Sequence, residues 1–219
     1  MTKSGPVKRR YRSPVREQRA GSTRLAIIRA ASGMFEAQGY GPVSIDAVAE
    51  AAGVSRATVF NAVGAKAALL RACYDVAIVG DDEPVPLPER PWARPVREAP
   101  DGPTLLARYA HMATVVEGRV AGIYEVMRGA ASAHPDVREH WDQIRRERRG
   151  GAANVVTMLE ERGPLRPGLA SRAAADIVFV LIDPGLYHQL VVEQGWTDHA
   201  FESWLADTFQ AQLLLRAER

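Results

Sequence analysis

Hydrophobic residues recur with helical periodicity through most of the chain, beginning after residue 21. The first apolar stripe consists of Leu25, Ile28, Ala31 and Phe35. These positions follow the 3.6-residue period of an α-helix. Ser22 or Thr23 is placed to cap the start of this helix, and Gly39 predicts its end. The pattern therefore predicts a helix from about residue 22 to residue 38.

Two shorter helices joined by a tight turn are predicted next. Ser44 offers a hydroxyl to the free N–H groups of the first, and Gly53 supplies the left-handed backbone that ends it. Ser55 caps the following helix. The residues expected to face inward are Ile45, Val48 and Ala49 on the first helix and Val59, Phe60 and Val63 on the second. This arrangement is typical of a helix-turn-helix, whose second helix enters the major groove of DNA.

The exposed start of the second short helix carries side chains that suit base recognition. Arg56 can offer paired donors to guanine, Asn61 can pair with adenine, and Ala57 can contact a thymine methyl group. Thr58 lies among them, and Lys66, at the start of the next helix, suits a phosphate. A plain helical hairpin also fits residues 44–63.

A proline-rich segment separates two helical regions. Residues 66–79 continue as a linking helix that stops at Gly80, and half of the 14 prolines then fall between Pro84 and Pro103. Proline lacks a backbone N–H and breaks helices. We expect residues 80–103 to form an extended linker or loop that is not helical throughout, in which Trp92 folds back over a pocket or packs on the surface.

Helical periodicity resumes at Thr104 and continues to the end of the chain. Gly118 and Gly122 indicate either a break or a close helix contact in the first of these helices. The further helices are predicted over residues 135–149, 152–162, 170–182 and 199–215, with Asp183 and Pro184 as a cap and a first-turn proline. The segment 170–182 is apolar nearly all round, which predicts a helix buried between others.

Charge is distributed unevenly, and the N-terminal end is strongly basic. The first 24 residues hold eight Lys or Arg residues and one Glu, whereas the whole chain carries a net charge of only +2. A segment with this composition is expected to stay disordered until it meets a polyanion. Residues 1–21 are therefore predicted to be a basic arm that contacts DNA through Arg9, Arg10 and Arg12. A tail that only improves solubility is the alternative.

Composition weighs against several other classes of protein. Cys73 is the only cysteine, so a disulfide framework is excluded, and no apolar run is long enough to cross a membrane. We expect a cytoplasmic protein without membrane contact. The five histidines show no metal-ligand spacing, and neither a nucleophile elbow nor a dinucleotide loop is present. No catalytic residue, metal or cofactor is predicted, although a helical enzyme or a protein-binding adaptor remains the alternative.

The N-terminal pattern resembles the tetracycline-repressor (TetR) family. The resemblance rests on Gly39-Tyr40, Ser44-Ile45, residues 49–55, Thr58-Val59-Phe60, Lys66 and Leu69-Leu70, and it covers about residues 22–75. Weaker matches follow at residues 163–166, Asp183-Pro184 and Gly195-Trp196. The chain departs from the pattern at Phe60, where tyrosine is common, and at Ala65, where a serine or asparagine would cap the linking helix better.

The resemblance implies an all-α fold with two domains. A three-helix helix-turn-helix DNA-binding domain over residues 22–79 includes the linking helix, and a helical ligand-binding and dimerisation domain occupies residues 104–219. It further implies a homodimer that binds double-stranded operator DNA, usually as a repressor, and that a small-molecule effector releases. The residues expected at DNA are Arg9, Arg10, Arg12, Ser44, Ser55, Arg56, Ala57, Thr58, Phe60, Asn61 and Lys66.

Large side chains on the predicted helices 104–127 and 135–149 exceed what one helix face needs, which favours a mostly apolar pocket. The residues expected to line it are Tyr109, Met112, Val116, Ile123, Tyr124, Met127 and Trp141. The same residues could equally form a core. The dimer interface is expected along residues 170–193 and 199–215, with Val178, Leu181 and Leu205 as contacts.

Overall fold

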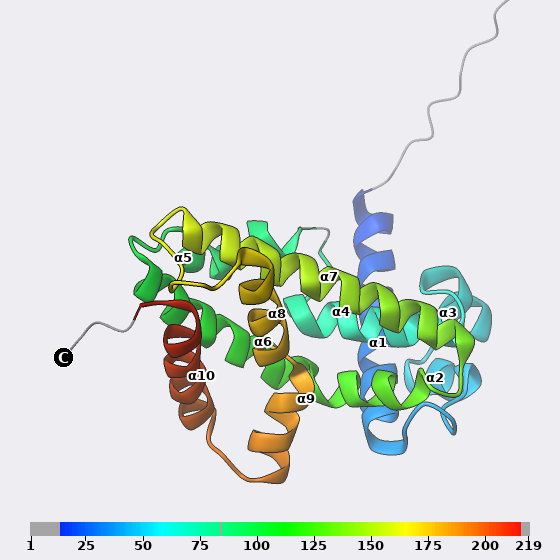
Figure 1. Ribbon diagram of the computed structural model, residues 1–219. Helices are drawn as coiled ribbons and strands as arrows, with labels where there is room; N and C mark the ends of the chain where they lie inside the picture. The colour runs from blue at the N-terminus through cyan, green and yellow to red at the C-terminus, as the bar shows by residue number, and fades with distance from the viewer. Residues whose placement is uncertain (1–13, 84, 216–219) are drawn as a thin grey trace, which may run out of the picture.

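The protein folds entirely into helices over the part of the chain that the structure describes (Figure 1). This computed structural model describes residues 14–83 and 85–215. The N-terminal helices α1, α2 and α3 lie on one side of the molecule, and α10 lies on the other (Figure 1). Helices α6 and α7 extend between the two sides (Figure 1). The all-α class predicted from the sequence is confirmed.

The N-terminal domain contains α1 (Pro14–Gln38), α2 (Ile45–Ala51) and α3 (Arg56–Ala62). Helix α1 begins eight residues before the predicted start, so the prediction of disorder was wrong for residues 14–21. Proline is favourable in a first helical turn, because the N–H that it lacks would have no helical partner there. The predicted contacts Arg9, Arg10 and Arg12 lie outside the described residues.

Helix α4 (Lys66–Val79) has the bounds that the sequence predicts. It ends at Gly80, whose φ of 89° is left-handed backbone that favours glycine. At its other end, Ala65 provides no side-chain hydrogen bond to the first turn. Ala65 is therefore the poor helix cap that the sequence predicts.

The proline-rich segment is a loop with short helical turns and not an extended linker, which agrees with the expectation that it is not helical throughout. It contains η1 (Leu87–Glu89), η2 (Pro91–Ala93) and α5 (Arg94–Arg97). Buried Arg90 organises the first part, because its guanidinium donates to the carbonyls of Glu83 and Val85 and to the carboxylate of Asp81. A guanidinium that saturates nearby carbonyls gives structure to a segment whose prolines cannot support a long helix.

Six helical elements follow in the described part of the chain, and the first two of them are longer than the sequence predicts. They are α6 (Gly102–Ala130), α7 (Pro135–Glu160), α8 (Ser171–Leu181), α9 (Pro184–Tyr187), the π-helix η3 (His188–Glu193) and α10 (Asp198–Leu213). Asp101 starts α6 two residues early by accepting a hydrogen bond from the Thr104 N–H at 2.8 Å. The two helices predicted over residues 135–149 and 152–162 form one, because buried side chains on both sides of Gly150 and Gly151 fix a single axis.

Two glycines of α6 mark close contacts between helices. A Cβ at Gly118 would lie 3.0 Å from the hydroxyl of Tyr187, and one at Gly122 would lie 3.1 Å from a carboxylate oxygen of Glu36. Helix α6 nevertheless runs without interruption. Of the two interpretations that the sequence left open, close contact is therefore the correct one.

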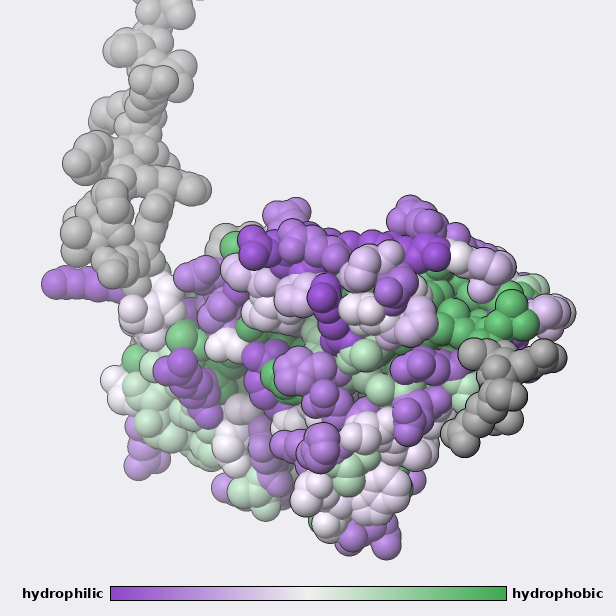
Figure 2. Space-filling view, turned by 90° about the vertical axis from the view of Figure 1, so that its left-hand side faces the viewer, coloured by the Kyte–Doolittle hydropathy of each residue, from purple (hydrophilic) through white to green (hydrophobic). Residues whose placement is uncertain are grey.

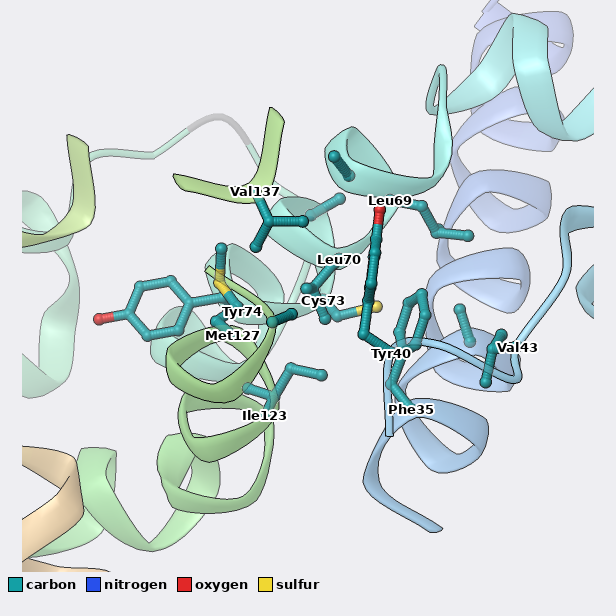
Figure 3. Close-up of a cluster of buried hydrophobic side chains, with 14 of the residues drawn as sticks. Phe35, Tyr40, Val43, Leu69, Leu70, Cys73, Tyr74, Ile123, Met127 and Val137 are labelled. Carbon is teal, nitrogen blue, oxygen red and sulfur yellow. The ribbon is translucent and has the colours of Figure 1, made fainter. Parts of the chain in front are cut away.

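Two hydrophobic cores stabilise the chain, and their boundary differs from the domain boundary. The first core joins α1 and α4 to α6 and α7, and Figure 3 shows Phe35 and Tyr40 on one side of α4 and Ile123 and Met127 on the other. The second core joins α6, α7, α8 and α10. The N-terminal helices therefore share a core with part of α6 and α7.

The surface is mostly polar on the side shown in Figure 2, where hydrophobic residues gather near the C-terminal end of the chain. Within residues 14–83 and 85–215, no single helix has the length and apolar character that a membrane span requires. Ser171–Leu181 and Pro184–Glu193 satisfy that criterion only as a joined pair, with a bend of 42° between them.

Candidate DNA-reading surface and ligand cavity

Local hydrogen bonds fix the positions of α2 and α3. The Ser44 hydroxyl accepts the Ala47 N–H at 3.1 Å, and the Ser55 hydroxyl accepts the Thr58 N–H at 3.1 Å. Gly53 takes the left-handed conformation between the two helices, with φ 67°. Because Val59 is fully buried, the opposite face of α3 points outward. The turn that the sequence predicts is therefore present, with the serine caps that it predicts.

The outward face of α3 presents the predicted reading residues together. Arg56, Ala57 and Asn61 are exposed, and Thr58 is half-buried. The expectation that Phe60 faces inward was wrong, because its side chain is 42% exposed. Each helical residue turns about 100° from the one before it, which carries Phe60 away from the face of Val59. We call this set, Arg56, Ala57, Thr58, Phe60 and Asn61, the reading surface.

Arg56 is held by two neighbours in the absence of DNA. Its guanidinium contacts the carboxylate of Asp46 at 2.5 Å and lies 5.4 Å from the centre of the Phe60 ring. Both members of the ion pair are more than half exposed. Exposed pairs contribute about 0–1 kcal/mol, which is less than the 1–3 kcal/mol of a good bidentate base contact. Arg56 can therefore exchange Asp46 for a base.

Lys66 lies beside the reading surface with its ammonium group directed to the loop before α2. It donates to the Gly41 carbonyl at 3.0 Å and lies 4.2 Å from the centre of the Tyr40 ring. Partial burial lowers the pKa of Lys66, although the negative charge of Asp136 opposes that effect. The structure thus gives Lys66 a role in holding the loop, beside its predicted contact with phosphate.

A cavity of about 870 Å³ lies in the C-terminal domain. Its wall is formed by α4, the folded segment after it, α6 and α7. Of the seven predicted lining residues, the structure places Tyr109, Met112 and Val116 at this wall. The other four, Ile123, Tyr124, Met127 and Trp141, belong to the first hydrophobic core and do not line the cavity. They lie farther along α6 and α7, where the DNA-binding domain covers them.

Arg148 is the centre of a hydrogen-bonded network at one end of the cavity. Its guanidinium donates to the Asp183 carboxylate and the Tyr124 hydroxyl, each at 2.9 Å, and to the carbonyls of Phe179 and Ile182. The Tyr124 hydroxyl also donates to Asp183. The positive charge of Arg148 therefore has a matched carboxylate and several acceptors.

Glu117 is the cavity residue that the sequence analysis missed. Its side chain lines the cavity, the residue is only 3% exposed, and both carboxylate oxygens lack a hydrogen-bond partner among the described residues. Burial raises the pKa of Glu117 well above its ordinary value, although Arg148 opposes this effect. The sequence does contain a signal for this position. Glu117 lies four residues from both Ala113 and Ala121, so helical periodicity places it on the same inward face of α6 as these two small residues.

Two predicted dimer contacts are core residues of the single chain. Val178 and Leu205 are fully buried in the second hydrophobic core, so their assignment to an interface was wrong, whereas Leu181 is half-buried. The prediction that residues 170–182 are buried all round was also wrong, since Val180 is 61% exposed. Packing of α8 against α7 and α10 selects the face with Val178 as the inner one.

The sequence and fold can now be compared with those of known proteins. Residues 27–73 match the family of bacterial regulatory proteins called tetR. A search of curated protein sequences found no significant match.

Solved structures cover nearly the whole chain. A TetR-family regulator from Rhodococcus sp. is 17% identical, with a TM-score of 0.66 over 86% of this chain and 97% of its own. NalD from Pseudomonas aeruginosa, the secondary repressor of the MexAB-OprM multidrug efflux pump, is 18% identical, with a TM-score of 0.66 over 91% and 100%. A regulator from Saccharomonospora viridis in complex with choline is 16% identical, with a TM-score of 0.64 over 89% and 99%.

The fold and the turn between α2 and α3 define an N-terminal helix-turn-helix followed by a larger helical region. The family match over residues 27–73, which lie within α1 to α4, shows that this N-terminal part of the chain is similar to the tetR family of bacterial regulatory proteins.

Proposed function

We propose that this protein is a dimeric repressor that binds a near-palindromic operator and releases it when a small, largely apolar effector enters the cavity. The observation that carries this proposal is the position of α4. One face of α4 lines the cavity, and the other packs with α1 in the first hydrophobic core. An effector that displaces α4 would therefore also move the DNA-binding domain.

The reading surface supports the DNA-binding part of the proposal. Exposed Arg56 and Asn61 suit guanine and adenine, and the N-terminus of α3 favours nearby phosphates. The Ser44 and Ser55 hydroxyls lie at helix N-termini that would face the DNA backbone. The predicted arm with Arg9, Arg10 and Arg12 would add contacts to phosphates or the minor groove.

Contacts from α4 to both domains support the release mechanism. Leu69, Leu70 and Cys73 pack in the shared core (Figure 3). Val76 and Val79 of the same helix line the cavity. A second connection runs through Arg24, which donates to the carbonyl of Ala62 at the end of α3 and pairs with Asp82 at the cavity wall. An effector that prefers one position of these elements shifts the population of DNA-binding conformations.

Dimerisation is proposed through the outer faces of α8 and α10, which contact each other. Ala173, Ile177 and Val180 recur at helical spacing on α8, and Val180 is strongly exposed. Two reading helices must lie about 34–36 Å apart, or somewhat farther, to meet successive major grooves, which requires a second copy. Val180→Arg should yield monomers that retain helical content, measured by light scattering and circular dichroism. A dimer of unchanged affinity would place the interface elsewhere.

The solved structures support an effector and a repressor role by analogy. The Saccharomonospora viridis protein holds choline, and NalD is described as a repressor. Neither defines the effector or the operator of this chain, because identities below 20% preserve the fold more than the ligand.

Selection of binding sites from random double-stranded DNA provides the test. We expect a near-palindromic site with two half-sites about one helical turn apart, bound as a dimer in gel-shift assays. An effector found by thermal-shift screening should weaken operator binding, and the operator should weaken effector binding by the same factor. Failure to enrich any sequence would overturn DNA recognition, and equal effector affinity with and without operator would overturn the switch.

A further inference from the structure

Glu117 is a buried carboxyl group without a partner, and it faces the cavity. The residue is 3% exposed, and neither carboxylate oxygen has a hydrogen bond among the described residues. Buried polar side chains are nearly always satisfied, so an exception in a cavity wall indicates that a ligand group supplies the missing bond. The ligand should therefore carry a donor near the middle of α6.

Four other carboxylates of the cavity wall differ from Glu117 because they have cationic partners. Asp81 pairs with Arg90, and Asp82 pairs with Arg24. Asp75 and Glu147 contact the two sides of the Arg71 guanidinium at 2.7 Å each. Arg148, the guanidinium that most affects Glu117 electrostatically, is already bonded to Asp183. Glu117 is thus the buried acid whose charge the protein leaves unmatched.

Apolar side chains also line the cavity that Glu117 faces. Met112, Val116 and Val120 from its own helix line the cavity, together with Ile144 and Val155 from α7. Such walls bind hydrocarbon or aromatic groups by burying apolar surface. A ligand that satisfies both features has an apolar body and one positively charged donor.

We propose that the effector of this regulator is a lipophilic amine, whose ammonium group pairs with Glu117 and whose apolar part fills the cavity. The proposal rests on the effector-release function proposed above and specifies the chemical class of the effector. Charge-assisted hydrogen bonds are about twice as strong as neutral ones, so the amine gains more from Glu117 than a neutral alcohol does. An anion would instead meet a buried acid.

Pairing with an amine also changes the protonation of Glu117. Burial raises its pKa, and the groups that face it are Arg148 from α7, Asp183 before α9, Tyr109 on α6 and Tyr187 on α9. In the free protein, the protonated carboxyl group therefore persists to higher pH than that of an exposed glutamate. When an ammonium ion binds, the carboxyl group releases its proton to the buffer and the ion pair forms. Binding of an amine should release up to one proton, and binding of an alcohol none.

Three probes with ten carbons each, which differ in the charge of the head group, test this proposal. The neutral fluorophore N-phenyl-1-naphthylamine first reports occupancy of the cavity, and decylamine, decanol and decanoate then compete with it. We expect decylamine to displace the fluorophore at about tenfold or more lower concentration than the other two. Calorimetry in two buffers of different ionisation enthalpy should show proton release with decylamine alone.

Glu117→Gln should abolish the preference for decylamine while the fluorophore still binds. Glu83→Gln, which alters an exposed carboxylate at the same cavity, should keep the preference. A raised pKa makes the ionised form unfavourable in the folded state, so wild type loses stability as pH rises above the ordinary range of a carboxyl group. The Gln variant should lack that loss, and thermal unfolding at pH 5 and pH 8 checks both this expectation and its folding.

The outcomes separate this proposal from the wider function. Equal displacement by decylamine and decanol, tighter binding of decanoate, or an unchanged preference in Glu117→Gln would each overturn the amine assignment while leaving an effector cavity in place. Absence of fluorophore binding together with no calorimetric binding signal for decylamine, decanol or decanoate would overturn the cavity as an effector site altogether.

Discussion

The reading surface and the cavity of this protein are built in opposite ways. All residues of the reading surface belong to one short helix, Arg56–Ala62, whose position follows from the Ser55 cap and the Gly53 turn. The residues of the cavity wall are spread along the chain from Tyr74 to Pro184, and they come together only in the folded protein. A surface for a repetitive polymer can be local, whereas a container for a small molecule needs walls on several sides.

The comparison also shows that the two regions are not energetically separate. Helix α4 belongs to both, and the first hydrophobic core continues from α1 to α6 and α7 (Figure 3). The boundary in the sequence, at the proline-rich segment, is therefore no boundary in the packing. Four predictions test how far the two regions depend on each other.

The largest expected effect concerns the shared core. Ile123→Ala removes a fully buried side chain of α6 and should reduce the free energy of unfolding by about 2–5 kcal/mol. Because Ile123 packs in the core that includes α1 and α4, amide hydrogen exchange should become faster in those helices too. Leu205→Ala, of similar size but in the second core, is the control and should affect α1 less. Equal exchange in α1 for both variants would show that the DNA-binding domain has a core of its own.

The next effect concerns base recognition. Arg56→Ala should weaken binding to the selected operator by about 1–3 kcal/mol and affect random DNA much less, because a base contact is lost. Fluorescence anisotropy on both DNAs measures the difference. Asp46→Asn removes the ion pair of Arg56 without removing the guanidinium, and we expect it to leave operator binding equal or slightly tighter. An equal loss on both DNAs for Arg56→Ala would reduce its role to a phosphate contact.

A smaller effect concerns communication between the regions. Asp82→Asn breaks the pair with Arg24, whose other contact is the end of α3. We expect the variant to bind effector and operator separately, while the coupling free energy between them falls by about 0.5–2 kcal/mol. Titration of operator with and without effector measures this quantity. Unchanged coupling would leave α4 as the sole route.

The smallest effect concerns the start of α4. Ala65 has the extended backbone of a helix cap, with φ −74° and ψ 170°, but its side chain makes no capping hydrogen bond. Ala65→Ser should therefore stabilise the protein by about 0.5–1 kcal/mol in thermal or urea unfolding. Ala68→Ser, one turn into the same helix, should bring no such gain. A stabilisation of the same size in both variants would rule out capping as its cause.

The sequence by itself determined the features that depend on a few neighbouring residues. The caps at Ser44 and Ser55, the left-handed turn at Gly53 and the end of α4 at Gly80 each follow from hydrogen bonds or backbone preferences within one or two turns. Helical periodicity likewise indicated the all-α class. These interactions are present in the chain before any distant segment arrives, which is why they can be read from it.

Only the tertiary structure decided which periodic side chains meet solvent, core or cavity. It buried Val178 and Leu205 in the chain's own core, directed Phe60 outward and assigned Ile123 to the shared core. It also placed Glu117 in the cavity wall without a partner. Each outcome depends on which helix packs against which face, and that choice is set by the combined burial of residues distant in sequence.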